Sequence, residues 1–170
     1  MSIFSDSIKL VDLPKYEDHR GFLTSFWTPE IGEFQEDRCS VSNRNVLRGL
    51  HGDAVTDKLI VVLSGEVEFF ATPYLKDNPN FGEKTFITLS GKTPQAIYLP
   101  KGFVNGHLCL SEECVFFYKW SHYYNGVDAQ VSVSYDDAYL NIPWSISSPV
   151  LSDRDKHTST SFEDLVHGKN

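Results

Sequence analysis

Hydrophobic and polar residues alternate over short stretches of this chain, and glycine or proline interrupts the alternation about every ten residues. β-Branched and aromatic residues fill these stretches, and Ser64-Gly65 between two of them has the form of a two-residue hairpin turn. The spacing predicts an all-β fold, for which a double-sheet jelly roll is the economical architecture at this length. The strands expected are 58–63, 66–72, 95–99, 107–110, 114–119 and 131–134.

One segment near the end of the chain has helical character. Thr160 and Glu163 stand at capping-box spacing just before the apolar pair Leu165 and Val166. The pattern predicts a short C-terminal helical segment attached to the β structure. We expect the whole chain, residues 1–170, to form one jelly-roll domain.

Composition and charge argue against several classes of partner. The 170 residues include 15 Lys and Arg and 23 Asp and Glu, a net charge of −8 without a local basic patch, so nucleic acid is not expected as a partner. No apolar run reaches the roughly 18 residues of a membrane span, and the N-terminus lacks the basic start of a signal peptide. We therefore expect a cytoplasmic protein without a membrane partner. Cys39, Cys109 and Cys114 are scattered, which excludes a disulfide framework and a Cys-x-x-Cys zinc site.

His51 is the histidine whose sequence surroundings best suit a catalytic role. It follows an apolar run between two glycines, and Asp53 stands two residues later. If this segment is a strand, His51 and Asp53 share a face and point into one cavity. Histidine suits general base catalysis near neutral pH, although a hydrogen-bonded turn histidine fits the segment as well.

A metal site is the next possibility to weigh, because jelly-roll barrels often bind one. Such sites draw on a His-x-His pair, a carboxylate and a further histidine on a later strand. Here the pair is reduced to His51-Gly52-Asp53, and spacing alone does not make His107 the later ligand. We therefore predict no bound metal and an activity indifferent to chelators.

Two later segments carry groups suited to acid–base chemistry. Residues 114–120 alternate as a strand, which places Tyr118 on one face with Cys114, Phe116 and Trp120. A tyrosine there either reaches a cavity or satisfies its hydroxyl at a sheet edge. Asp155 closes the polar segment 151–155, a pattern that taken alone is typical of a turn or a helix cap.

An ordered set of motifs resembles the dTDP-4-dehydrorhamnose 3,5-epimerase family, from about residue 18 to residue 155. The most specific of them is Leu-Arg-Gly-Leu-His at 47–51. The others are Asp-His-Arg-Gly-Phe at 18–22, Lys-Leu at 58–59, Gly-Glu-Val at 65–67, Asn-Phe-Gly at 80–82, Leu-Pro-Lys-Gly-Phe at 99–103, Leu-Ser-Glu at 110–112, Tyr-Lys at 118–119 and Leu-Ser-Asp-Arg-Asp at 151–155. The resemblance implies a cupin-type jelly roll that works without metal or cofactor, usually as a homodimer.

The activity that the resemblance implies is epimerisation of a nucleotide-diphosphate 4-keto-6-deoxy sugar at C3, C5 or both, in the biosynthesis of surface-polysaccharide sugars. Carried over by motif, His51 is the general base and Asp155 its orienting partner. Tyr118 is the opposing acid, and Lys58 is the cation that stabilises the enolate. These residue types suit the chemistry, since a C–H beside a ketone is removable only when the enolate oxygen is stabilised, and inversion needs proton delivery from the other face.

The same resemblance implies substrate contacts. Arg20 and Arg48 match the positions that grip the diphosphate, for which the fork of a guanidinium is well suited. Further substrate-binding residues expected in the cavity are Arg38, Asp53, Asn105, His107 and Tyr124.

The chain also departs from the family pattern. Asp53, Asn105 and His107 belong to altered motifs, Gly-Asp after Leu-His and Phe-Val-Asn-Gly-His in place of Phe-Ala-His-Gly-Phe. Phe69 and Ser25 stand at usually acidic positions, and Arg38-Cys39 stands where an Asn-His pair is usual. The altered pattern is similar to the branch that acts on GDP-linked 4-keto heptoses, so the sugar, hexose or heptose, and the nucleotide, dTDP, GDP or CDP, stay open. The alternatives are a 3,4-ketoisomerase, a non-catalytic sugar-nucleotide-binding barrel and a metal-dependent cupin oxygenase.

Overall fold

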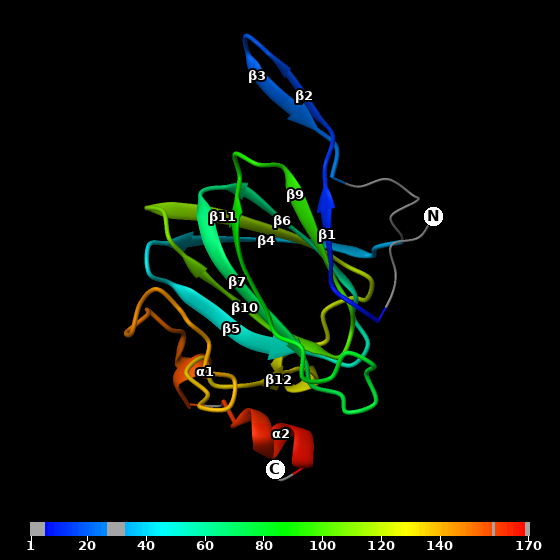
Figure 1. The fold of residues 1–170 in the computed structure, drawn as a ribbon, viewed down its shortest axis with the longest axis vertical. Helices are drawn as coiled ribbons and strands as arrows, with labels where there is room; N and C mark the ends of the chain where they lie inside the picture. Colours follow the sequence, from blue (N-terminus) through cyan, green and yellow to red (C-terminus); the bar gives the residue numbers. More distant parts are fainter. Residues whose placement is uncertain (1–5, 27–32, 158, 169–170) are drawn as a thin grey trace.

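Two five-stranded antiparallel sheets pack face to face in the computed structural model, which describes residues 6–26, 33–157 and 159–168 (Figure 1). The first sheet has the order β1 (Lys9–Asp12), β9 (Gln95–Leu99), β6 (Lys58–Ser64), β11 (Glu113–Trp120), β4 (Glu36–Asn43). The second has the order β12 (Val131–Ser132), β5 (Leu47–Gly52), β10 (Phe103–Cys109), β7 (Glu66–Pro73), β8 (Thr85–Ser90). The predicted all-β, double-sheet jelly roll is therefore confirmed.

Each strand expected from the sequence overlaps an observed one, and residues 95–99 match β9 at both ends. Within these two sheets, β1, β4 and β8 were not expected, and β5 was considered only as a possible strand. β4 begins with the polar run Glu-Asp-Arg-Cys-Ser and forms one edge of its sheet, so it lacks the β-branched pattern of a central strand. The predicted hairpin is wrong. A tight turn with Gly65 at a φ of 79° does join β6 to β7, but it crosses from the first sheet to the second, where β7 pairs with β10 and β8 instead of with β6.

The C-terminal part contains two short helices, α1 (Asp153–His157) and α2 (Phe162–His167). The sequence predicted α2 but assigned its cap one residue too early. Ser161 is the N-cap, and its hydroxyl accepts the Asp164 N–H at 3.1 Å. Thr160 instead exchanges backbone hydrogen bonds with Ser132 and Ser134, which keeps it extended. Among the described residues, no helix is long and apolar enough to cross a membrane.

The two sheets enclose a core at one end of the sandwich and a cavity at the other. Inward-facing apolar residues of both sheets fill the core, and Phe69 of β7 stacks on Phe116 of β11 at 6.5 Å between ring centroids. A second apolar cluster lies on the outer face of the second sheet, where Phe162 of α2 packs with Leu50, Phe70 and Val104. The C-terminal segment therefore braces β5, the strand that carries His51.

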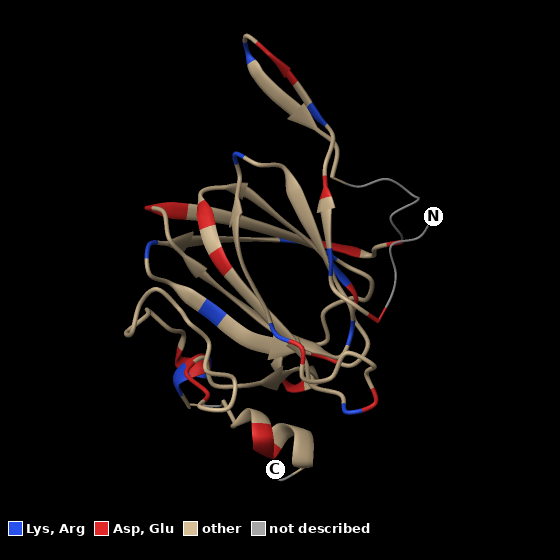
Figure 2. Ribbon diagram, in the orientation of Figure 1, with Lys and Arg blue, Asp and Glu red and all other residues tan. Residues whose placement is uncertain are grey.

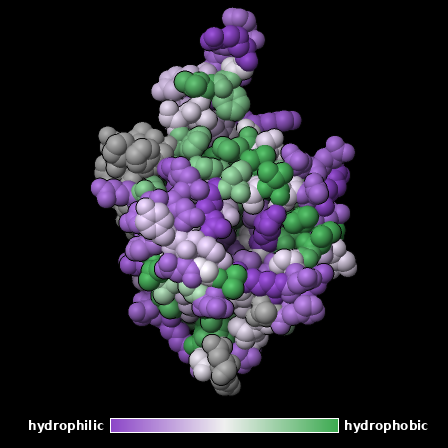
Figure 3. Space-filling model, turned by 180° about the vertical axis from the view of Figure 1, so that it is seen from behind, coloured by the Kyte–Doolittle hydropathy of each residue, from purple (hydrophilic) through white to green (hydrophobic). Residues whose placement is uncertain are grey.

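Strands β2 (Lys15–Asp18) and β3 (Gly21–Thr24) form a separate hairpin that projects from the body of the molecule (Figure 1). The hairpin carries charges of both signs (Figure 2), and hydrophobic surface lies just below its tip in the view from behind (Figure 3). Tyr16, Phe22 and Leu23 are 63%, 42% and 68% exposed. These side chains are unusually apolar for an exposed ribbon, which is typical of a surface that another chain covers.

We expect Gly52→Ala to destabilise the protein by about 1–3 kcal/mol, because the seam between β5 and β10 is too close for a side chain. A Cβ at Gly52 would lie 2.1 Å from the Phe103 carbonyl oxygen. The control is Gly82→Ala, at a φ of +94° with open space around it, where only backbone strain of about 1 kcal/mol is expected. Urea unfolding measures both, and an unchanged midpoint for Gly52→Ala contradicts the close packing described here.

Candidate active site

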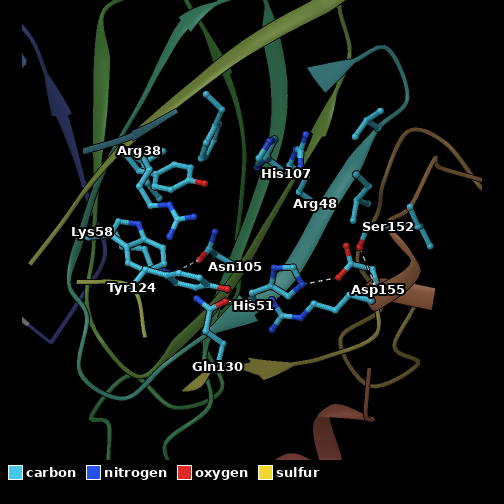
Figure 4. Close-up of a pocket in the computed structure, with 18 of the residues that line it drawn as sticks. Arg38, Arg48, His51, Lys58, Asn105, His107, Tyr124, Gln130, Ser152 and Asp155 are labelled. Carbon is cyan, nitrogen blue, oxygen red and sulfur yellow. Dashed lines mark hydrogen bonds and ion pairs between the residues drawn. The ribbon is translucent and has the colours of Figure 1, made fainter. Parts of the chain in front are cut away.

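A cavity of about 460 Å³ opens between the two sheets. Strands β6 and β11 of the first sheet form one wall, and β5 and β10 of the second form the other. Residues 150–155, from the loop before α1 and its first turn, line the mouth (Figure 4). The cavity therefore brings together residues from segments that are far apart in the sequence, Arg38 of β4 and Gln130 among them.

His51 and Asp155 form a buried pair at one side of this cavity. The His51 Nε2 lies 2.5 Å from the Asp155 Oδ1, and the Asp155 side chain is 4% exposed (Figure 4). Burial alone would raise the pKa of Asp155, but hydrogen bonds from His51, Ser152 and Gly49 together with the charge of His51 hold it below its ordinary value. Asp155 is therefore ionised, so the His51 Nε2–H donates to it and Nδ1 is left as the basic nitrogen.

Lys58 is buried on the opposite wall. Its ammonium donates to the Asn105 side-chain oxygen at 3.2 Å and lies 5.1 Å from the Trp120 ring centroid. Burial lowers the pKa of Lys58 to about 8, and the nearby Arg38 charge lowers it further while Asp53 opposes the shift. Lys58 is thus a cation at neutral pH whose charged form is poorly solvated, the state in which it gains most from a nearby anion.

Tyr118 lies on the cavity side of β11. As the alternation predicted, Cys114, Phe116 and Trp120 share this inward face and are buried. Burial raises the pKa of Tyr118, and the charges of Arg38 and Arg48 oppose that rise. The Tyr118 hydroxyl is consequently protonated at neutral pH and can act only as a proton donor there.

His107 is a neutral imidazole in the cavity wall. Its ring stacks on Phe116 at 3.8 Å between centroids, and in the described part of the chain its buried Nε2 has no hydrogen-bond partner. Burial, together with the charges of Arg48 and His51, lowers the pKa of His107 to about 3. Phe69 faces it across the β10–β7 pairing, so no carboxylate from that strand favours the charged form.

Two arginines bring positive charge to the cavity. Arg48 donates to the Ser42 hydroxyl at 2.8 Å and to the Val41 carbonyl at 3.1 Å. Arg38 lies against the rings of Tyr124 and Trp120, with its Cζ 4.3 Å and 4.9 Å from their centroids. Both arginines were expected in the site, as were Tyr124 and Asn105, and all four line the cavity.

Two predicted contacts do not lie in the cavity. β5 ends at Gly52, and the Asp53 carboxylate instead accepts the backbone N–H groups of Val55 and Thr56 at 3.0 Å and 2.6 Å. Arg20 lies on the β2–β3 hairpin, paired with Asp18 at 2.6 Å and with its side chain 79% exposed. Asp53 therefore holds a turn, and Arg20 does not reach this chain's own cavity.

The cavity also contains residues that the sequence did not single out as contacts: Trp120, Gln130, Ser152 and Arg154. Arg154 donates to the Gln130 side-chain oxygen at 3.2 Å and to the Ser132 hydroxyl at 2.8 Å, which ties α1 to β12 and to the residue before it. Trp120 was detectable, since it shares the predicted face of Tyr118. Within residues 6–26, 33–157 and 159–168, no group of three or more His, Cys, Asp or Glu is placed to hold a metal ion.

Comparison with known proteins gives one family. The family model described as dTDP-4-dehydrorhamnose 3,5-epimerase matches residues 6–163. A dTDP-4-dehydrorhamnose 3,5-epimerase of Shigella flexneri is 32% identical over 158 residues, covering 86% of this chain and 87% of the relative. The one from Salmonella typhimurium is 33% identical over 152 residues, covering 82% of each chain.

Solved structures agree with this result. The epimerase of Legionella pneumophila, in complex with dTDP-4-keto-L-rhamnose, has a TM-score of 0.85 at 30% identity and covers 95% of this chain and 90% of its own. The dTDP-4-dehydrorhamnose 3,5-epimerase of Bacillus anthracis, with TDP and PPi bound, has a TM-score of 0.84 at 30% identity, covering 91% and 95%.

We expect His107→Phe to reduce the acid sensitivity of folding. Between pH 6.5, the ordinary pKa, and about 3, the unfolded chain binds a proton at His107 that the folded chain does not, so stability falls as pH falls through this window. The wild-type protein should lose about 3 kcal/mol more than the variant between about pH 7 and pH 4. Urea unfolding at several pH values measures the slope, with His122→Phe, at an exposed position, as control. Equal slopes for wild type and His107→Phe contradict the neutral buried state.

Proposed function

Because the chain belongs to the dTDP-4-dehydrorhamnose 3,5-epimerase family, it is a nucleotide-sugar epimerase, and we propose that His51, Lys58 and Tyr118 carry its proton transfers. The observation that supports this most is that the candidate base and the candidate acid lie on opposite walls of the cavity. A base held by a carboxylate lies on the β5 wall, whereas an acid and a cation lie on the β6–β11 wall. Inversion of a carbon beside a ketone requires this arrangement, since the proton leaves one face and returns to the other.

In the first half of the reaction, the Nδ1 of His51 removes the proton next to the C4 ketone. Asp155 fixes the imidazole orientation through Nε2 and stabilises the imidazolium that forms. The negative charge moves to the ketone oxygen, where the Lys58 ammonium stabilises the enolate. Because Lys58 is buried, little water competes with the enolate oxygen for its ammonium, which strengthens the attraction between the two charges.

In the second half, the Tyr118 hydroxyl delivers a proton to the opposite face of the same carbon. The substrate's diphosphate binds Arg48 at the cavity wall. The cavity carries the cations Arg38, Arg48, Lys58 and Arg154 on a protein whose net charge is −8, and this concentration of positive charge favours a diphosphate.

The experiment follows solvent deuterium and stereochemistry together. The probes are dTDP-4-keto-6-deoxyglucose, because the Legionella relative holds a dTDP-4-keto sugar, and a GDP-linked 4-keto-6-deoxy heptose, because Asn105 and His107 depart from the family pattern. Proton NMR in deuterated water reports which carbon exchanges and which is inverted. A non-catalytic binding barrel would exchange neither.

Tyr118→Phe should keep measurable exchange at the carbon next to the ketone while losing most of the inverted product, since exchange returns a solvent deuteron through His51. His51→Asn, the matched control, should lower both by roughly 10²- to 10⁴-fold. If the ratio of exchange to inversion in Tyr118→Phe equals that of wild type, another group is the acid, and if His51→Asn exchanges normally, His51 is not the base.

Arg20 requires a second copy of the chain in this proposal. On its own chain it sits on the projecting hairpin, outside the cavity, and the exposed Tyr16, Phe22 and Leu23 leave that hairpin with an apolar surface to cover. A two-fold homodimer in which each hairpin docks on the partner would bring Arg20 to the partner's diphosphate and bury these side chains.

Mixing two inactive variants tests this arrangement. In mixed dimers of Arg20→Ala and His51→Asn, one of the two sites combines an intact His51 with an intact Arg20. We expect each variant alone to be impaired and the mixture, after subunit exchange, to recover roughly a quarter of wild-type activity, since random pairing gives half mixed dimers. A monomer by sedimentation, or no recovery in verified mixed dimers, contradicts the proposal.

A further inference from the structure

Arg38 lies in the cavity wall against two aromatic rings. Its Cζ lies 4.3 Å from the Tyr124 centroid and 4.9 Å from the Trp120 centroid, and Glu36 lies 3.6 Å from its Nη1. Glu36 is itself held by the Tyr124 N–H at 2.7 Å. These contacts hold the guanidinium in the wall, and it projects into the cavity toward Asn105 and Tyr124 (Figure 4).

Tyr118 is the cross-strand partner of Arg38 in the first sheet. The β4–β11 register pairs the two directly, so their side chains leave neighbouring strands on the same face, with Cβ atoms about 5 Å apart in such pairs. The Nη1 of Arg38 is buried and has no hydrogen-bond partner among the residues that the structure describes. A donor without a hydrogen-bond acceptor thus lies beside the proton-donating tyrosine.

Proton delivery by Tyr118 leaves a negative charge on its phenolate oxygen, next to the guanidinium of Arg38. A C–H bond forms at the enolate carbon, the O–H bond of Tyr118 breaks, and the electron pair of that bond stays on the phenolate oxygen. The ketone re-forms, so one negative charge moves from the enolate oxygen beside Lys58 to the Tyr118 oxygen. Solvent later returns a proton to the phenolate, and His51 releases its proton to solvent.

We propose that Arg38 is the positioning residue that stabilises the Tyr118 phenolate, so that the negative charge passes from Lys58 to Arg38 as the substrate is reprotonated. The inference rests on the proposed function, and it adds a role for a residue at which the family pattern has asparagine. An uncharged amide cannot serve as the counter-charge, so this chain differs from that pattern in how its acid works.

The charges around Tyr118 agree with this role. Burial makes the phenolate costly, and Arg38 is the foremost charge opposing that cost, with Arg48 of β5 next. Glu36 and Cys39, both from β4, act in the opposite direction. On the β6 side the register partner of Tyr118 is the uncharged Ile60, so Arg38 is the cation directly paired with Tyr118 across the sheet.

The first test compares Arg38→Asn and Arg38→Lys with wild type on dTDP-4-keto-6-deoxyglucose and the GDP-linked heptose. We expect Arg38→Asn to lower inversion roughly ten- to hundredfold, the effect of losing one close counter-charge, while deuterium exchange changes less than about threefold. Arg38→Lys, which keeps the charge, should recover part of the inversion. Arg44→Asn, an exposed arginine outside the cavity, is the control and should leave both rates unchanged.

The second test asks whether Arg38 acts through Tyr118. In a Tyr118→Phe background, Arg38→Asn should cause no further loss of inversion, since no phenolate forms. A more acidic phenol, 3,5-difluorotyrosine at position 118, should restore part of the inversion lost in Arg38→Asn. Preserved exchange shows that each variant is folded with a working base.

Four results would overturn the inference. If exchange and inversion fall equally in Arg38→Asn with a raised KM, Arg38 binds the diphosphate or the enolate rather than serving Tyr118. Additive losses in the double variant, or no rescue by difluorotyrosine, exclude action through the phenolate. If the wild-type chain exchanges deuterium into neither probe, the proposed function itself fails and this inference falls with it.

Discussion

The contact between His51 and Asp155 is the interaction on which the rest of the site depends. It joins β5 to a helix 104 residues later in the chain, and the carboxylate it uses is almost fully buried. A buried carboxylate is tolerated only with good partners, and leaving one unpaired costs about 3 kcal/mol or more. The same pair therefore anchors the C-terminal segment to β5 and orients the imidazole of His51. The second apolar cluster, around Phe162 of α2, supports that pair from outside the sheet.

The sandwich keeps opposing chemical roles on separate sheets. The second sheet presents the imidazole, and the first presents the ammonium and the phenol, each from the inward face of a strand with neighbours on both sides. Because side chains of packed sheets are held by the core behind them, here Phe69 and Phe116, the distance across the cavity is a property of the fold. Connecting segments line the mouth, and among them residues 152–155 also reach the proton path, because Asp155 holds the imidazole of His51.

Sequence reasoning gave the strands with β-branched and aromatic runs, because burial on both sides of a strand imposes that composition. It did not predict β4, whose polar residues alternate between partly buried and exposed positions. The face of Tyr118 followed from alternation alone. The partnership of His51 with Asp155 did not, since nothing local relates residues so far apart, and it came only from resemblance.

Asp53 was wrongly expected in the cavity because the strand ends one residue earlier, at Gly52. Arg20 was misplaced for a different reason. In the proposed dimer it acts in the cavity of the partner subunit, which a single chain does not contain.

The mouth of the cavity lies outside the strands that carry the acid, the base and the cation. Val150, Leu151 and Gln130 line it from connecting segments, whereas the seam between β5 and β10 tolerates no added side chain at Gly52. Substitutions that alter which sugar or nucleotide enters can therefore accumulate in the connections while the strands stay fixed. For enzyme engineering, libraries that vary substrate choice should therefore target the mouth residues Gln130, Val150 and Leu151, and the strands that carry the acid, the base and the cation should be kept unchanged.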